Sequence, residues 1–206
     1  MEFLTIPRRT FAVTRFAEWF MYACVYAPDS APGSALEAIL VDFAAGFSPL
    51  VEQSSSTTVT IDISGTESLF GPHELLAREI FDRAQILGLT VSVAIADNPD
   101  AAILIARYNK EDGGEGGNRG VIVVPPDKQR VVLSPLPLEA LDPLLVAIDP
   151  VRAAEIVETL HLWGLETLGD FAALPEKGIS ETLDQPGLKL QKLARGTNRR
   201  TLQYVI

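Results

Sequence analysis

The sequence predicts an α+β fold followed by a small helical region, and three observations support this. Strand and helix patterns follow one another in the order βαββαβ over residues 21–134. The next stretch, SPLPLEALDPLLVAIDP, is interrupted by prolines as a linker is. Beyond it every pattern is helical. We therefore expect an N-terminal extension over residues 1–20, an α/β domain over 21–134, a linker over 135–149 and a helical domain over 150–206.

The first elements of the α/β domain are predicted by apolar periodicity. They are, in order, a buried strand over residues 21–27, a helix over 35–45, and two strands over 47–53 and 57–63. The last strand has the clearest pattern, because Val59, Ile61 and Ile63 alternate with polar residues. Its polar link to the preceding strand predicts a hairpin.

The rest of the domain continues the alternation. We expect a helix over residues 73–87 with a stripe of Leu75, Leu76, Ile80, Ala84 and Leu87, then a strand over 90–96, a helix over 99–108, and short strands over 121–124 and 130–133. The glycine-rich stretch 110–120 follows no strand and carries no Lys-Ser/Thr pair. It is therefore predicted to be an exposed loop rather than a phosphate-binding loop.

The helical domain is predicted to contain three helices. They cover residues 151–163, 167–173 and 188–195, with Thr167 as the N-cap of the second. Trp163 and Phe171 lie on apolar helical stripes, which predicts packing in the core. His73 and His161 have no second His or Cys nearby, so both are expected to be structural.

Composition limits the possible functions. The chain has 206 residues, a formal net charge of −10 and a sequence pI near 4.7. This acidic balance argues against nonspecific binding of nucleic acid by the whole surface, because phosphate contacts need clustered Lys and Arg. The one cysteine, Cys24, excludes an internal disulfide and a cysteine-rich zinc site, and its apolar surroundings predict a buried, unreactive thiol.

No segment of the sequence predicts export or a membrane. No run reaches the roughly 18 apolar residues of a membrane span. Arg15 and Glu18 interrupt the apolar run near the N-terminus, so it does not read as an export signal. We expect a cytoplasmic protein that has no cofactor.

The stretch TIDISGTESLFGPHELLAREIFDRAQILGLTVSVAIADNPDAAILIAR resembles the palm of the Y-family DNA polymerases (UmuC/DinB type). It is most similar to the ImuB branch, the mutasome accessory proteins. MYACVYAPDS resembles the first palm strand, LPLEAL the palm-to-thumb link, and the stretch from LHLWGLETLG to KLARG the thumb. The resemblance implies a ferredoxin-like palm followed by a small, helix-hairpin-helix-like thumb.

The resemblance also indicates where metal-binding carboxylates would lie. Nucleotidyl transfer in this family uses two metal ions held by carboxylates from two palm strands. Aligned on the family pattern, those positions are occupied here by Ala27, Thr57 and Thr58, none of which is acidic. Asp62 matches a family position that does not bind metal. Because neutral side chains hold divalent ions poorly, the resemblance implies no metal site and no catalytic residues.

Two further departures concern domains. Ala27 and Thr57 are separated by little more than one helix and one strand, so the fingers domain is expected to be absent. The sequence also stops shortly after the thumb-like region, which leads us to expect no little-finger domain.

Residues 187–206 carry five cations and no acidic residue: Lys189, Lys192, Arg195, Arg199 and Arg200. In Y-family thumbs, helices joined by glycine-containing turns approach the DNA backbone, and Gly164 marks such a turn. The resemblance implies weak backbone contacts from these six residues. The alternative is a solvated basic face on a terminal helix.

Three classes of function remain open. We expect a catalytically inactive accessory protein of DNA repair and translesion synthesis, hence not an enzyme. It would bind DNA weakly or dock a mutasome partner of the SOS response, such as an error-prone polymerase or a RecA-like accessory. The alternatives are an active nucleotidyltransferase that uses carboxylates such as Asp29, Asp42 and Glu67, or a folded remnant without activity.

Overall fold

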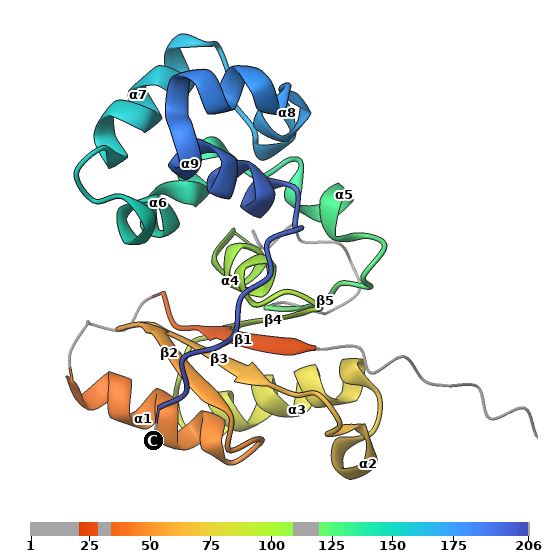
Figure 1. Cartoon of the computed structure of the whole chain (residues 1–206). Coiled ribbons are helices and arrows are strands. Elements are labelled where there is room, and N and C mark those ends of the chain that lie inside the picture. The colour runs from red at the N-terminus through yellow and green to blue at the C-terminus, as the bar shows by residue number, and fades with distance from the viewer. Residues whose placement is uncertain (1–20, 29–33, 109–119, 206) are drawn as a thin grey trace, which may run out of the picture.

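The computed structural model describes residues 21–28, 34–108 and 120–205, so the predicted extension over residues 1–20 lies outside the described part. A five-stranded sheet with the order β2-β3-β1-β4-β5 forms the first half (Figure 1). Its strands are β1 (Tyr22–Tyr26), β2 (Val51–Ser55), β3 (Thr58–Asp62), β4 (Ser92–Ala96) and β5 (Val121–Val123). Helices lie on both of its faces (Figure 1). The predicted α+β class is confirmed.

Strand β1 is the centre of the sheet. It runs antiparallel to β3 and to β4, with Tyr22 opposite Asp62 on one side and Ala96 on the other. Strands β2 and β3 form the predicted hairpin, whereas β4 and β5 are parallel and are joined through a helix. Segments 57–63 and 90–96 therefore share one sheet, as the strand pattern required.

Two helices, α1 (Ser34–Ala45) and α3 (His73–Ile86), cover one face of the sheet (Figure 1). The short α2 (Glu67–Phe70) precedes α3. The buried stripe of α3 consists of Leu76, Ala77, Ile80 and Ala84. The predicted stripe was wrong at Leu75 and Leu87, which are both 59% exposed. Consecutive helical residues point about 100° apart, so Leu75 cannot share the inward direction of Leu76.

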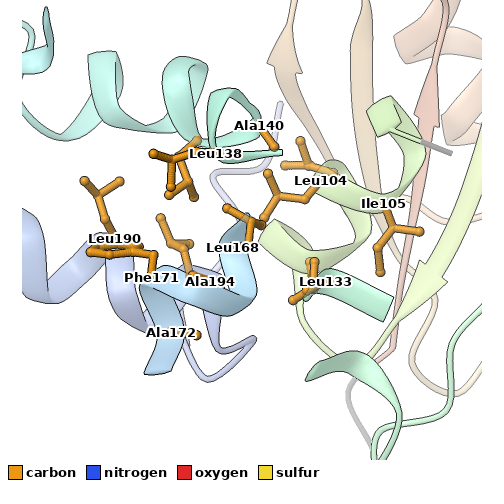
Figure 2. Close-up of a cluster of buried hydrophobic side chains, with 14 of the residues drawn as sticks. Leu104, Ile105, Leu133, Leu138, Ala140, Leu168, Phe171, Ala172, Leu190 and Ala194 are labelled. Carbon is orange, nitrogen blue, oxygen red and sulfur yellow. The ribbon is translucent and has the colours of Figure 1, made fainter. Parts of the chain in front are cut away.

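Helix α4 (Pro99–Tyr108) covers the other face and is apolar along most of its surface. Its N-cap, Asn98, accepts hydrogen bonds from the N–H groups of Asp100 and Ala101. One side of α4 packs on the sheet and the other on the helical half of the chain, and Figure 2 shows Leu104 and Ile105 in the resulting cluster. One hydrophobic core therefore runs from Cys24 in the sheet to Leu190 in the last helix.

The second half of the chain is helical. Its elements are α5 (Gln129–Leu133), the 3-10 helix η1 (Leu138–Leu141), α6 (Asp142–Ile148), α7 (Ala153–Leu162), α8 (Leu168–Ala173) and α9 (Glu176–Ala194). Thr167 caps α8 as predicted, in a reciprocal capping box with Asp170. No helix among the described residues is long and apolar enough to cross a membrane.

Three predicted elements differ from the structure. The strand expected over residues 130–133 is wrong, because these residues belong to α5; a run of four apolar and polar residues is too short to show a period. The expected linker contains η1 and α6, whose Leu138, Leu141 and Leu145 are buried. The helix expected over residues 188–195 is the second part of α9, in which Asp184 (φ 54°) has non-helical backbone angles just before Pro186 and separates two helical segments. The domain boundaries themselves remain a prediction.

Candidate functional site

The three positions at which the resemblance places metal ligands lie together. Ala27 follows β1, and its N–H donates to the carbonyl of Thr57 at 2.9 Å. Thr58 lies opposite Tyr26 in the register of β1 and β3. Ala27 and Thr58 are both fully buried. Among the described residues, no group of three or more His, Cys, Asp or Glu side chains is placed to hold a metal ion.

Arg107, for which the sequence predicted no role, faces the end of β1 and β3 where Ala27 and Thr58 lie. Arg107, near the end of α4, places Nη2 at 3.1 Å from Ser55 Oγ and 3.4 Å from Thr58 Oγ1. Its guanidinium carbon lies over the ring of Tyr26, 5.3 Å from the ring centroid. No carboxylate of the described residues pairs with it, and Nε is buried without a hydrogen-bond partner. A guanidinium attracts phosphate oxygens and repels divalent cations.

The other carboxylates considered in the sequence lie elsewhere. Asp62, at the opposite end of β3, accepts a hydrogen bond from the N–H of Ser64 at 2.9 Å, which is the role of a turn residue. Asp42 is exposed on α1, and Glu67 on α2 contacts His73 at 3.3 Å. Asp29 lies outside the described residues.

Residues 197–205, which we call the C-terminal segment, run from the helical half of the chain across the sheet. In Figure 1 this dark blue segment leaves α9, passes in front of the strands and ends beside α1. Its backbone is held at β2, since the N–H of Gln203 donates to Glu52 Oε2 at 2.7 Å and that of Val205 to the carbonyl of Val51 at 2.8 Å. The hydroxyl of Tyr204 is 3.5 Å from Asp62 Oδ2. The segment thus covers the polar face of β2 and β3 beside α4.

Arg200 anchors this segment between two acidic side chains. Its Nη1 and Nη2 each lie 2.7 Å from an oxygen of Glu52, and its Nε lies 2.7 Å from Asp100 Oδ1. The side chains of Glu52 and Asp100 are only 8% and 5% exposed. Burial alone would lower the pKa of Arg200, but the hydrogen bonds and charges of the two carboxylates raise it overall. Arg200, predicted to contact DNA, is therefore engaged inside the protein.

Glu52 is expected to make the free energy of unfolding depend on pH in the acidic range. Burial alone would raise its pKa, but hydrogen bonds from Arg200, Gln203 N–H and Ser54, with the charge of Arg200, lower the pKa overall. Its ionised form contributes stability above the unfolded pKa of about 4.3, and that contribution is lost as pH falls through the lower folded pKa. Between roughly pH 5 and pH 3, we expect the free energy of unfolding of the wild type to fall by more than that of Glu52→Gln. Urea unfolding at several pH values measures both. Parallel pH curves for the two proteins would contradict this.

The remaining predicted DNA-contacting residues fall into two groups. Arg195 donates to the carbonyl of Ala172 at 2.9 Å and pairs with Glu176, and Arg199 lies 3.5 Å from Asp97 while staying 66% exposed. Lys189 and Lys192 are exposed on α9, and neither pairs with a carboxylate of the described residues.

The turn predicted at Gly164 is present, with φ 73°. Its N–H already donates to the carbonyl of His161 at 2.9 Å. The same hydrogen cannot also serve a phosphate, so this position offers no free donor of its own.

The remaining single-residue predictions have mixed outcomes. Cys24 is fully buried as predicted, and burial raises the pKa of its thiol to about 12, which disfavours the reactive thiolate. Phe171 is fully buried as predicted, whereas Trp163 is 40% exposed because it lies at the C-cap of α7, where the helix leaves the core. His161 Nε2 lies 3.3 Å from Glu139 Oε1 at the surface.

The sequence is similar to that of known DNA polymerases and polymerase-related proteins. Residues 21–107 match the model of the impB/mucB/samB family. DNA polymerase IV of Caulobacter vibrioides is 30% identical over 154 residues, covering 74% of this chain and 34% of the relative. Protein ImuB of the same species is 28% identical over 153 residues, covering 74% of this chain and 29% of the relative. The chain therefore spans about a third of the length of such curated relatives.

Solved structures share the fold. The crystal structure of DinB from Sulfolobus solfataricus matches with a TM-score of 0.58 and 19% identity, over 82% of this chain and 46% of that one. A ternary complex of Dbh matches with a TM-score of 0.57 and 21% identity, over 82% and 47%. The five-stranded sheet and its helices thus correspond to the palm of these proteins, and the match extends into the helical half of the chain.

The comparisons correct one expectation from the sequence. The prediction that the chain is not an enzyme is wrong, because several of its curated relatives are named DNA polymerase IV and the solved structures it matches are DNA polymerases. The neutral residues at positions 27, 57 and 58 do not by themselves establish that the chain is inactive.

Proposed function

Because the chain is a relative of the Y-family DNA polymerases, we propose that it is a DNA-repair protein of translesion synthesis that contacts the DNA backbone through its helical domain. The proposed role is that of an accessory in the SOS response. It would work in the cytoplasm beside mutasome proteins such as an error-prone polymerase or a RecA-like accessory. Binding is expected to be weak, because few cations are available for phosphate.

The observation that carries the proposal is the free charge on α9. The helix is kinked at Asp184, and both Lys189 and Lys192 lie in the part after the kink, with Lys192 in the last turn. Both ammonium groups are exposed and unpaired among the described residues. Two exposed cations that no carboxylate neutralises attract phosphate by their charge.

Two of the arginines that were predicted to contact DNA already form ion pairs within the protein. Arg195 and Arg200 already bind carboxylates and carbonyls of the protein, so contacting phosphate would require breaking those contacts. Arg199 keeps most of its side chain exposed and can join the two lysines. We therefore propose Lys189, Lys192 and Arg199 as the DNA contacts and leave out Gly164, whose N–H is occupied.

The test is a double variant, Lys189→Ala/Lys192→Ala, binding a short primer-template. We expect weaker binding to all sequences alike and a salt slope lower by roughly two, since each lost phosphate contact removes about one. Binding would be measured by fluorescence anisotropy at several salt concentrations.

Lys177→Ala is the matched control, because Lys177 is also on α9 but lies before the kink and is 86% exposed. Equal affinity and slope for the double variant and the wild type would refute the contact set. If the wild type binds no DNA at all, the accessory role would have to rest on docking to a partner protein.

A further inference from the structure

A groove of about 720 Å³ lies between α6 and α7, on the helical domain. Val146, Ala154, Val157 and Leu162 supply much of its apolar lining. Val146 and Leu162 are 54% and 80% exposed, although both are large aliphatic residues. Such residues are rarely left together in water without a partner.

Acidic groups accompany the apolar lining. Asp142 and Glu158 line the groove, and no lysine or arginine is among its lining residues. Asp142 Oδ1 is buried and has no hydrogen-bond partner. Burial, and then the neighbouring charge of Glu139, raise the pKa of Asp142, although His161 opposes this. Because two acids and no cation line the groove, it favours a ligand that brings positive charge.

Two further exposed apolar residues adjoin the groove lining in the sequence, next to Pro150 and Leu162. Val151 is 90% exposed at the turn before α7, and Trp163 is 40% exposed just after it. A small molecule in the groove would leave these residues uncovered, whereas a helix lying along the groove would reach toward them. The acidic lining also disfavours nucleic acid, because phosphate would be repelled.

We propose that the α6–α7 groove binds one amphipathic helix of a protein partner, whose apolar side chains fill the groove and whose Lys or Arg donates to Asp142. Apolar anchors at i, i+3 or i+4, and i+7 are how a helix occupies such a groove. The cation pairs with the Asp142 carboxylate and is opposite in charge to Glu158, which also lines the groove. None of the proposed DNA contacts, Lys189, Lys192 and Arg199, lines this groove, so the two proposals are tested independently.

The test is selection from a displayed library of random peptides of about 16 residues, roughly four helical turns. The expected result is enrichment of basic amphipathic sequences. A selected peptide, synthesised and labelled, should lose roughly tenfold or more in affinity for Ala154→Arg, as loss of a central interface position does. Ala154 is exposed, so this variant places bulk and positive charge in the groove without changing the core.

Two further variants make the test specific. Asp142→Asn should weaken binding and flatten its salt dependence, because the ion pair is lost. Ile86→Arg is the matched control on α3, where Ile86 is 84% exposed, and should bind as the wild type does. Circular dichroism checks that every variant is folded.

Several outcomes would overturn the proposal. Enriched peptides that are acidic or lack helical periodicity would do so, as would equal binding to Ala154→Arg. A concentration-dependent dimer that Ala154→Arg abolishes would assign the groove to a second copy instead. Displacement of the selected peptide by a synthetic peptide of residues 1–20 at equal concentration would assign it to this chain's own N-terminus.

Discussion

Replacing Arg200 with alanine is expected to lower the free energy of unfolding by about 3 kcal/mol, because it leaves two buried carboxylates without their cation. Glu52 and Asp100 are nearly inaccessible to water, and three 2.7 Å contacts to Arg200 compensate their charge. The low end of the range for buried pairs applies, because the Arg200 side chain is 30% exposed. Urea unfolding followed by circular dichroism measures the change.

Arg199→Ala is the matched control. Arg199 is the adjacent residue and also pairs with an acid, but its side chain is 66% exposed, so its loss should cost less than about 1 kcal/mol. A triple variant, Arg200→Met with Glu52→Gln and Asp100→Asn, should recover part of the stability, since no buried charge is then left alone. Equal losses for Arg199→Ala and Arg200→Ala would show that the buried pairing does not hold the C-terminal segment.

The sheet was predictable because its signals are local. The alternation of Val59, Ile61 and Ile63 with polar residues puts one set on each face, and all three are buried under α1 and α3. The cap of α4 at Asn98 and the capping box at Thr167 depend only on neighbours three residues or fewer away. Such patterns can be read without knowing the tertiary structure.

The long-range contacts were not predictable in this way. Arg200 and Glu52 are 148 residues apart, and the sequence around Arg200 shows only a run of cations without acids. That pattern favours a solvent-facing basic surface until the sheet supplies Glu52 and Asp100. Arg107 was missed for the same reason, because its place near Ser55 and Thr58 depends on how α4 crosses the strands.

The proposed site likewise has a part that the sequence could predict and a part that depends on the folded chain. Ala27, Thr57 and Thr58, the positions that the resemblance assigns to metal ligands, lie together at one end of two adjacent strands, and the assignment itself stays a prediction. The resemblance did not indicate which cations between residues 187 and 206 remain unpaired, because that depends on the acids each arginine meets in the folded chain. The contact set for DNA therefore had to be narrowed from the folded arrangement.

Leu104→Ala is expected to lower the free energy of unfolding by about 3 kcal/mol, the cost of deleting a buried leucine and leaving a cavity. Leu104 is 1% exposed, and Figure 2 shows it on α4 near Ala140 and Leu168 of the helical half. Because α4 belongs to the core on both of its sides, the variant should destabilise the sheet and the helices together.

Two residues of the chain report on the two halves separately. Cys24 is the only cysteine and is buried in β1, so thiol labelling reports opening of the sheet. Trp163 at the end of α7 reports on the helical half by fluorescence, in a Trp19→Phe background that removes the other tryptophan. Both probes should shift to lower urea by the same amount in Leu104→Ala, whereas Leu69→Ala, at a position 78% exposed, should leave both unchanged.

If the Trp163 signal changed at a lower urea concentration than the one at which Cys24 became reactive, the helical half would be an independent unit. The proline-containing stretch before α6 would then act as the linker that its sequence predicted, despite its buried leucines.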